Sequence, residues 1–180
     1  MNLQSHFILM SDYNQRMNSQ FYSVVKELGD YDINKDRGAY FQSILGTLNH
    51  ILVGDIIWLT RFSKHSKRYV SLTTLSDFPK PKGLDDIVFS NFTLLFAARE
   101  KVDLLICQWL KRETKESDFD ELLTYSNTKG VVSKRDFGEL VSHLFNHQTH
   151  HRGQLSTLLN QIKLDIGATD YLFEIPEHQA

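Results

Sequence analysis

The sequence predicts an all-α fold, a four-helix bundle with one long crossover connection, and three observations support this. Apolar residues recur at helical spacing through four long stretches of the chain. Residues that interrupt helices are sparse, since the 180 residues include only 3 prolines and 9 glycines. A long polar segment with two of these prolines separates the second stretch from the third, as in bundles whose chain crosses from one end to the other.

The four helices are predicted from their periodicity and from the residues at their ends. Residues 5–28 carry an apolar stripe that stops at Gly29, a residue type common just after helix ends. Residues 40–62 are apolar nearly all round, which indicates neighbours on most sides. Residues 84–110 begin with Asp85 and Asp86, and acidic side chains suit the positive end of a helix dipole. Residues 135–162 form the last predicted helix.

The connections are predicted from polar and turn-forming residues. Residues 63–83 carry several basic side chains together with Pro79 and Pro81, which is typical of a surface crossover loop. Before the last helix, residues 122–126 and 130–134 can pair as a short hairpin around residues 127–129. From residue 164 onward we expect the tail to pack back on the bundle. The pattern does not set the order of the helices.

Composition and charge narrow the class of protein. The length suits a single domain spanning residues 1–180, and 41% hydrophobic with 23% charged residues is ordinary for a soluble globular protein. A net charge of -2 gives no electrostatic reason to expect a nucleic-acid or membrane partner. No apolar stretch approaches the ~20 residues of a membrane helix. The N-terminus does not resemble a signal sequence, and the single cysteine, Cys107, cannot form an internal disulfide, so we expect a cytoplasmic protein.

Histidine is concentrated in the last predicted helix. The chain has 8 histidines, and four of them lie between His143 and His151. On a helical wheel of about 100° per residue, His147 and His151 fall inside the apolar stripe, whereas His143 and His150 lie to its sides. Two imidazoles four residues apart on one face can reach one metal ion. No glutamate follows His147, so the segment is not the HExxH protease motif.

A third ligand is expected because metal sites that perform chemistry usually combine three protein ligands with one open position. His50 is the candidate, because it lies in the middle of an otherwise apolar helix. Its face carries Ser43, Gly46, Thr47, Gly54, Ile57 and Arg61. The main apolar face, expected to point the other way, carries Phe41, Leu45, Leu48, Leu52 and Leu59. Either the small residues leave room for a ligand cavity, or they allow a close helix crossing beside a hydrogen-bonded histidine.

Several segments resemble the DinB/YfiT family. The stretch of residues 144–154, LFNHQTHHRGQ, resembles that family's signature, in which a segment close to His-x-x-x-His-Arg-Gly-Gln lies on the last bundle helix. The stretch of residues 48–59, LNHILVGDIIWL, is similar to the family's second helix. Further matches are Tyr13, Asn14, Asn18, Arg99 and Asp103. The resemblance spans nearly the whole chain.

The resemblance implies a fold, a site and a range of activities. It implies a four-helix bundle of up-down-down-up order and a homodimer. It also implies a three-histidine metal site, in which the family's first ligand matches His50 and the other two match His147 and His151. Some relatives are thiol-dependent transferases or isomerases that use bacillithiol, mycothiol or glutathione, and many have no known activity. The residues that match belong to the metal site and the scaffold, so they do not identify a substrate.

Three functions are compatible with these residues. The first is an enzyme in which one divalent transition metal activates a low-molecular-weight thiol toward an electrophile, since nitrogen ligands favour zinc, nickel, copper or iron over calcium. Among these we expect zinc or nickel. In such an enzyme His143, His150 and Gln154 would orient ligands or a small-molecule substrate, and Arg61 would bind a carboxylate. The second function is a metal-dependent binding or stress-sensing module without turnover, and the third is a purely structural metal site.

Other reactive residues have simpler interpretations. Cys107 is expected to be a buried structural thiol, since apolar residues surround it on the third helix. Asp55 is expected to take part in a buried hydrogen-bond network. For Arg152 we expect an ion pair with Asp165 or Asp170 rather than a chemical role.

Overall fold

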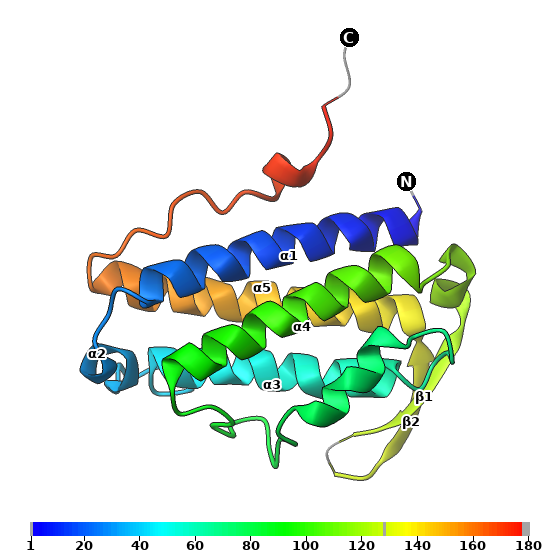
Figure 1. Ribbon diagram of the computed structural model, residues 1–180, viewed down its shortest axis with the longest axis horizontal. Helices are drawn as coiled ribbons and strands as arrows, with labels where there is room; N and C mark the ends of the chain where they lie inside the picture. Colours follow the sequence, from blue (N-terminus) through cyan, green and yellow to red (C-terminus); the bar gives the residue numbers. More distant parts are fainter. Residues whose placement is uncertain (1, 128, 178–180) are drawn as a thin grey trace.

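Four long helices, packed side by side, form the body of the computed structural model, which describes residues 2–127 and 129–177 (Figure 1). These helices are α1 (Leu3–Val25), α3 (Ile44–Phe62), α4 (Phe92–Arg112) and α5 (Phe137–Gln161). Shorter elements lie between and after them: α2 (Asp30–Asn34), η1 (Ser71–Asp77), η2 (Glu116–Asp120), β1 (Leu122–Ser126), β2 (Val132–Asp136) and η3 (Tyr171–Glu174). The predicted all-α class is confirmed.

The helices follow the up-down-down-up order. In Figure 1, α1 and α5 run from the end near the N-terminus to the opposite end, whereas α3 and α4 both run back toward it. Two consecutive parallel helices require a connection along the length of the bundle, and residues 63–91 provide it. Within the bundle α1 packs on α4 and α5, and α3 packs on α5 and α4. The facing helices α3 and α5 carry the histidines singled out above.

The core is rich in aromatic rings at the end of the bundle where α5 begins. Phe62, Trp109 and Phe137 are each 0% exposed, and their ring centroids lie 5.2 to 6.3 Å apart. Burying one such ring contributes roughly 1.5–3 kcal/mol, so this cluster anchors α3, α4 and α5 to one another. Aliphatic side chains, among them Leu48, Leu52, Leu144 and Leu155, fill the rest of the bundle.

Two helices begin later than predicted. Helix α4 begins at Phe92 rather than residue 84, and the Asn91 side chain caps it by accepting from the N–H of Leu94 at 3.0 Å. The acidic pair that suggested the earlier start lies in the crossover, where Asp86 accepts from the backbone N–H of Lys82 at 3.0 Å. Helix α3 begins at Ile44 rather than residue 40, because the Ser43 side chain caps it.

The connections are more ordered than a simple loop pattern indicates. The crossover contains the helical segment η1, which the sequence did not predict. The hairpin is confirmed, with its second strand at Val132–Asp136 rather than residues 130–134, while the predicted turn includes residue 128, outside the described residues. Helix α5 therefore begins at Phe137, with Asp136 as its cap.

The tail packs back on α1, as expected. The hydroxyl of Tyr13 donates to the carbonyl of Thr169 at 3.0 Å, and Arg16 pairs with Glu174 at 2.5 Å. Among the described residues, no helix combines the length and the apolar character needed to cross a membrane.

Candidate metal centre

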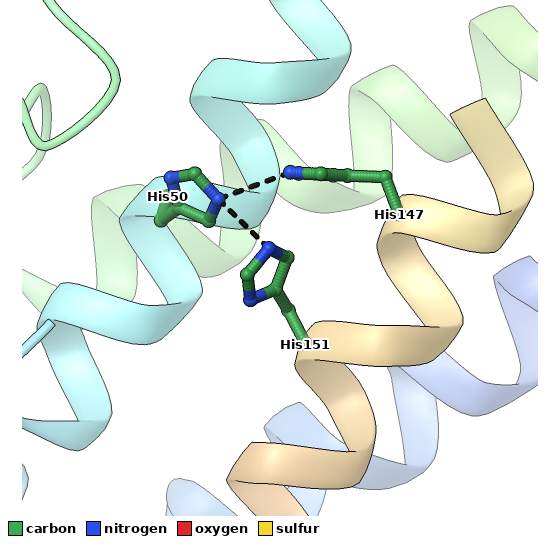
Figure 2. A group of neighbouring side chains, drawn as sticks. All are labelled: His50, His147 and His151. Carbon is green, nitrogen blue, oxygen red and sulfur yellow. Dashed lines mark hydrogen bonds between the residues drawn. The ribbon is translucent and has the colours of Figure 1, made fainter. Parts of the chain in front are cut away.

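Three histidines from the facing helices α3 and α5 meet inside the bundle. The Nε2 atom of His50 lies 3.0 Å from Nε2 of His147 and 3.0 Å from Nε2 of His151. Figure 2 shows all three rings directed toward one point between the two helices. Each residue offers one ring nitrogen, and these atoms all lie within 4.8 Å of one another. The spacing of the α5 pair, one helical turn apart, explains why both rings reach the same point.

Two of the three rings are held in a defined tautomer by hydrogen bonds on their far side. The Nδ1 atom of His50 lies 2.7 Å from the backbone carbonyl oxygen of Leu84, in the crossover. The Nδ1 atom of His151 lies 2.8 Å from Oε1 of Gln154. A carbonyl oxygen can only accept, so each Nδ1 carries a proton and each neutral ring presents a bare Nε2. Such outer hydrogen bonds are the usual means of orienting metal-ligating histidines.

The chemistry of these donors fits a cation. With their Nδ1 atoms protonated, His50 and His151 place two nitrogen lone pairs 3.0 Å apart, which is repulsive unless a positive charge lies between them. Around a tetrahedral zinc ion with bonds of 2.0–2.1 Å, two ligand nitrogens would be about 3.3 Å apart. The observed separations are close to that value. The Nδ1 atom of His147 is buried and lacks a hydrogen-bond partner among the described residues.

Small and flat neighbours make room for the rings. A Cβ atom on Gly54 would lie 2.7 Å from Cε1 of His147, so only glycine fits there. The ring of Phe41 stacks on His50, with centroids 3.8 Å apart and an angle of 17° between the planes. Phe41 was predicted on the face of the second helix that points away from His50, and this was wrong. Phe41 precedes α3, which begins after its Ser43 cap. Its ring is therefore not held on a face of the helix and can lie over the His50 imidazole.

The surroundings keep the histidines neutral. Burial lowers the pKa of His50, although the hydrogen bond to Leu84 and the nearby Asp85 carboxylate oppose this. Burial and the neighbouring histidines lower the pKa of His147 to about 3. Burial also lowers the pKa of His151, opposed by its hydrogen bond to Gln154. Neutral imidazole is the form that binds a metal, so all three rings are ready to ligate at neutral pH.

A buried polar network lies beside the histidines and crosses all four long helices. Asp55, next to Gly54 on α3, pairs with Arg99 of α4, and Arg99 also contacts Asp103 at 2.9 Å. Gln148, next to His147 on α5, donates to Asp55 at 3.0 Å. The expectation that Asp55 belongs to a hydrogen-bond network is therefore confirmed.

The same network takes up Arg152. Its guanidinium donates to Asn14 and, at 3.3 Å, to Asn18, both on α1. The predicted ion pair with Asp165 or Asp170 is wrong, because the side chain is 4% exposed and turns inward rather than toward the tail. Burial lowers the pKa of Arg152 to about 10.

The remaining candidate residues lie around the cluster rather than in it. His143 is exposed, and its ring centroid lies 6.2 Å from that of His147. His150 is also exposed, with its ring 4.8 Å from His151, and it accepts from the Gln154 amide at 3.3 Å. Of the predicted orienting residues, Gln154 is thus the one that forms a hydrogen bond with a cluster histidine.

Two other side chains with reactive or charged groups, those of Arg61 and Cys107, lie outside the histidine cluster. Arg61 stacks on the ring of Trp58, with 4.5 Å between the guanidinium carbon and the ring centroid. Cys107 is buried as expected, and burial raises the pKa of its thiol, which opposes a role as a nucleophile.

The crossover supplies the site with a hydrogen-bond acceptor that the sequence did not predict, the Leu84 carbonyl oxygen. The Leu84 carbonyl was missed because any residue has one, and only the path of the chain brings this one to His50. Gln154 was detectable, since it lies three residues after His151 on the same helix face.

Comparison with known proteins places the chain in a family. A family model described as the DinB family matches residues 1–179. The chain belongs to the DinB family. Protein DinB from Bacillus subtilis (strain 168) is 25% identical over 160 residues, which is 89% of this chain and 88% of that protein. The uncharacterized protein YizA from the same organism is 25% identical over 153 residues, covering 85% of this chain and 86% of that protein.

A solved structure shares the DinB-like fold. The crystal structure of a DinB-like protein from Bacillus cereus ATCC 10987 matches with a TM-score of 0.58 and 18% identity. The match covers 84% of this chain and 89% of that one. At this identity the likeness concerns the arrangement of the helices.

Proposed function

We propose that this DinB-family protein is a metal-dependent enzyme of the thiol-transferase type. In this proposal His50, His147 and His151 hold one divalent transition metal, zinc or nickel, and a low-molecular-weight thiol is joined to an electrophilic small molecule. The single observation that carries the proposal is the meeting of three ring nitrogens, two of which are bare because their Nδ1 protons are engaged elsewhere. Three protein ligands leave one coordination position for a reactant.

A cavity beside His50 supports a role in chemistry over a purely structural one. It measures about 620 Å³ and is lined by Tyr40, Phe41, Gln42, Gly46, His50, Leu84, Asp85 and Ile87. Among the described residues, three side chains supply the group of candidate ligating atoms. Asp85 lines the cavity but does not belong to that group. An open three-histidine site next to a cavity has room for a substrate, whereas a structural site is normally closed by four ligands.

The chain's own residues have separable tasks in this reaction. Leu84 and Gln154 hold the Nδ1 protons of two histidines, and Phe41 covers the face of the His50 imidazole against water. A divalent metal bound there supplies Lewis acidity, which lowers the pKa of a coordinated thiol. The thiol loses its proton, its sulfur forms a bond to the electrophilic carbon, and the leaving group departs with the electron pair.

The setting of the protein is part of the proposal. We propose that it works in the cytoplasm as a single-domain homodimer, without a nucleic-acid or membrane partner. Sedimentation of the purified chain at micromolar concentration should give a species near twice the chain mass of 20.9 kDa. A single species at the chain mass would contradict the dimer and leave the metal site unaffected.

Metal analysis of protein purified without a histidine tag tests the site. We expect near-stoichiometric zinc or nickel in the parent chain and a loss of most of it in His50→Ala, His147→Ala and His151→Ala. His143→Ala and His150→Ala are the matched controls, since both residues lie on α5 outside the group of three. Equal metal content in the parent and the three ligand variants would refute the assignment.

A thiol panel tests the reaction. Bacillithiol, mycothiol, glutathione and cysteine are each supplied with a generic electrophile such as monochlorobimane, with and without a chelator. We expect one thiol to react faster than the uncatalysed rate, and the chelator to abolish the difference. If metal binds at the three histidines but no thiol is turned over, the alternatives are a metal-dependent sensing module or a structural site.

A further inference from the structure

A second cavity lies close to the histidine cluster, on the side of His143. It measures about 550 Å³ and is bounded by α3, β1, β2 and α5. Its lining residues are Trp58, Tyr125, Arg135, Asp136, Glu139, Leu140 and His143. The rings of Trp58 and Tyr125 meet edge to face with centroids 5.2 Å apart, so they present a firm aromatic wall.

Arg61 is held against this wall without an anionic partner. Its guanidinium carbon lies 4.5 Å from the Trp58 ring centroid and 5.1 Å from that of Tyr125. Within residues 2–127 and 129–177, no carboxylate oxygen lies within 4.0 Å of its nitrogens. The side chain is half-buried, and its nitrogens keep access to solvent. Aromatic stacking fixes the flat guanidinium and leaves its N–H donors free for a ligand.

This cavity lies next to the proposed metal site. The ring of His143 packs edge to face on Trp58 at 5.1 Å and lies 6.2 Å from the ring of His147. His143 precedes His147 by four residues, a rise of about 6 Å along α5. Arg61 and His143 both contact the Trp58 ring. His143 therefore lies between the Trp58 ring and the ring of His147.

Arg61 itself lines the neighbouring cavity of about 450 Å³, and the charged groups that line the cavity beside His143 do not neutralise it. Asp136 is engaged as the cap of α5, where its Oδ1 accepts from the N–H of Glu139 at 2.9 Å. Arg135 and Glu139 are exposed and of opposite sign, so their effects largely offset one another. Exposed charges are screened by solvent, whereas a half-buried guanidinium pairs more strongly.

We propose that Arg61, Trp58 and Tyr125 form an anion-binding subsite for a small-molecule carboxylate that reacts at the histidine centre. The carboxylate pairs with the Arg61 guanidinium, the body of the molecule lies against Trp58, and its other end extends past His143 toward His147. This inference rests on the proposed function for the reaction at the far end of the ligand. The subsite itself requires only residues of α3 and β1. In this proposal Arg61 makes the subsite bind acidic substrates in preference to neutral ones.

The test uses 4-fluorobenzoate as the probe, followed by fluorine NMR of the ligand during titration with the full chain. Neutral 4-fluorobenzamide has nearly the same shape and should bind at least about tenfold more weakly, the difference expected from losing hydrogen bonds to a charged group. Arg61→Gln should weaken benzoate binding by a similar factor. Arg112→Gln is the matched control, because Arg112 is an exposed arginine in the last turn of α4 and should leave binding unchanged.

Repeating the titration without metal separates this proposal from the proposed function. Benzoate binding by the metal-free chain that depends on Arg61 supports the subsite, even if the histidines hold no metal or no thiol is turned over. Binding that Arg61→Gln leaves unchanged overturns it. Binding that appears only with zinc and is lost in His147→Ala but not in Arg61→Gln also overturns it, because the carboxylate would then be a metal ligand.

Discussion

Replacing Gly54 by alanine offers the sharpest test of the histidine centre, because the change is a single methyl group aimed at one ring. The added Cβ would lie 2.7 Å from Cε1 and 3.2 Å from Nδ1 of His147. The nearer contact is about 0.7 Å short of the 3.4 Å at which ordinary van der Waals contact begins. The His147 ring must therefore swing or shift by more than half an ångström, in a site where ligand distances tolerate about ±0.2 Å.

The same substitution should lower the metal affinity much more than it lowers the stability of the metal-free fold. Alanine is favoured over glycine within a helix by about 1 kcal/mol, which offsets part of the steric cost on α3. The His147 side chain is only half-buried and can move when no metal fixes it. We therefore expect the metal affinity of Gly54→Ala to fall by at least about tenfold, or 1.4 kcal/mol, while its metal-free melting temperature stays within a few degrees of the parent.

The assay is competition for zinc with a chelating dye, paired with circular dichroism melts of the metal-free protein. Gly153→Ala on α5 is the matched control, since a Cβ there meets nothing within 4 Å and should leave the affinity unchanged. In a double-mutant cycle, adding Gly54→Ala to His147→Ala should cost no further affinity, because the ring that clashes is gone. Unchanged zinc affinity in Gly54→Ala alone would refute the placement of His147 as a ligand.

Three further substitutions test the supporting structure. Gln154→Leu removes the acceptor of the His151 Nδ1 proton and should lower metal affinity by about 10–100-fold, whereas Gln154→Glu keeps an acceptor and should retain most of it in the same dye competition. Asp55→Ala leaves the buried Arg99 without one of its two carboxylates and should cost about 3–5 kcal/mol in urea unfolding of the metal-free chain; a loss under 1 kcal/mol would contradict the pairing. Burial raises the pKa of the Asp118 carboxyl, but its hydrogen bonds outweigh this and hold the pKa below the usual value. Its contribution is therefore present above about pH 4 and lost as pH falls through the lowered pKa, so Asp118→Asn should be less stable than the parent by about 1–3 kcal/mol at pH 7, and this difference should shrink as the pH is lowered below about 4.

The features of the site that the sequence predicted are those with a helical period. The inward pair His147 and His151 followed from their place in the apolar stripe of α5, and the face of His50 followed from the small residues around it. Helical periodicity predicts which side chains share a face, because a helix fixes the angle between successive side chains, whatever packs against it. The predicted room beside His50 is seen where Gly54 admits the His147 ring.

The features that the sequence did not predict depend on where the chain turns. Acidic residues at the start of a segment favour a helix, but Asp85 and Asp86 lie in the crossover. Helix α4 begins after them, at Phe92, where the Asn91 side chain caps it. Residues 84–91 are therefore an irregular segment rather than part of a helix, and the Leu84 carbonyl oxygen can reach Nδ1 of His50. A backbone carbonyl has no signature in the sequence, so only the folded path reveals it.

The buried polar network explains why the histidines face one another. Apolar side chains between α3 and α5 could pack nearly as well after a slip of one helical turn, since aliphatic contacts are not directional. The hydrogen bond from Gln148 to Asp55 is directional, and both residues adjoin the contact between Gly54 and His147. A slip would leave the fully buried Asp55 carboxylate without that amide, at a cost of about 1–3 kcal/mol or more for a charged group. The network thereby fixes the register that brings His50 opposite the α5 pair.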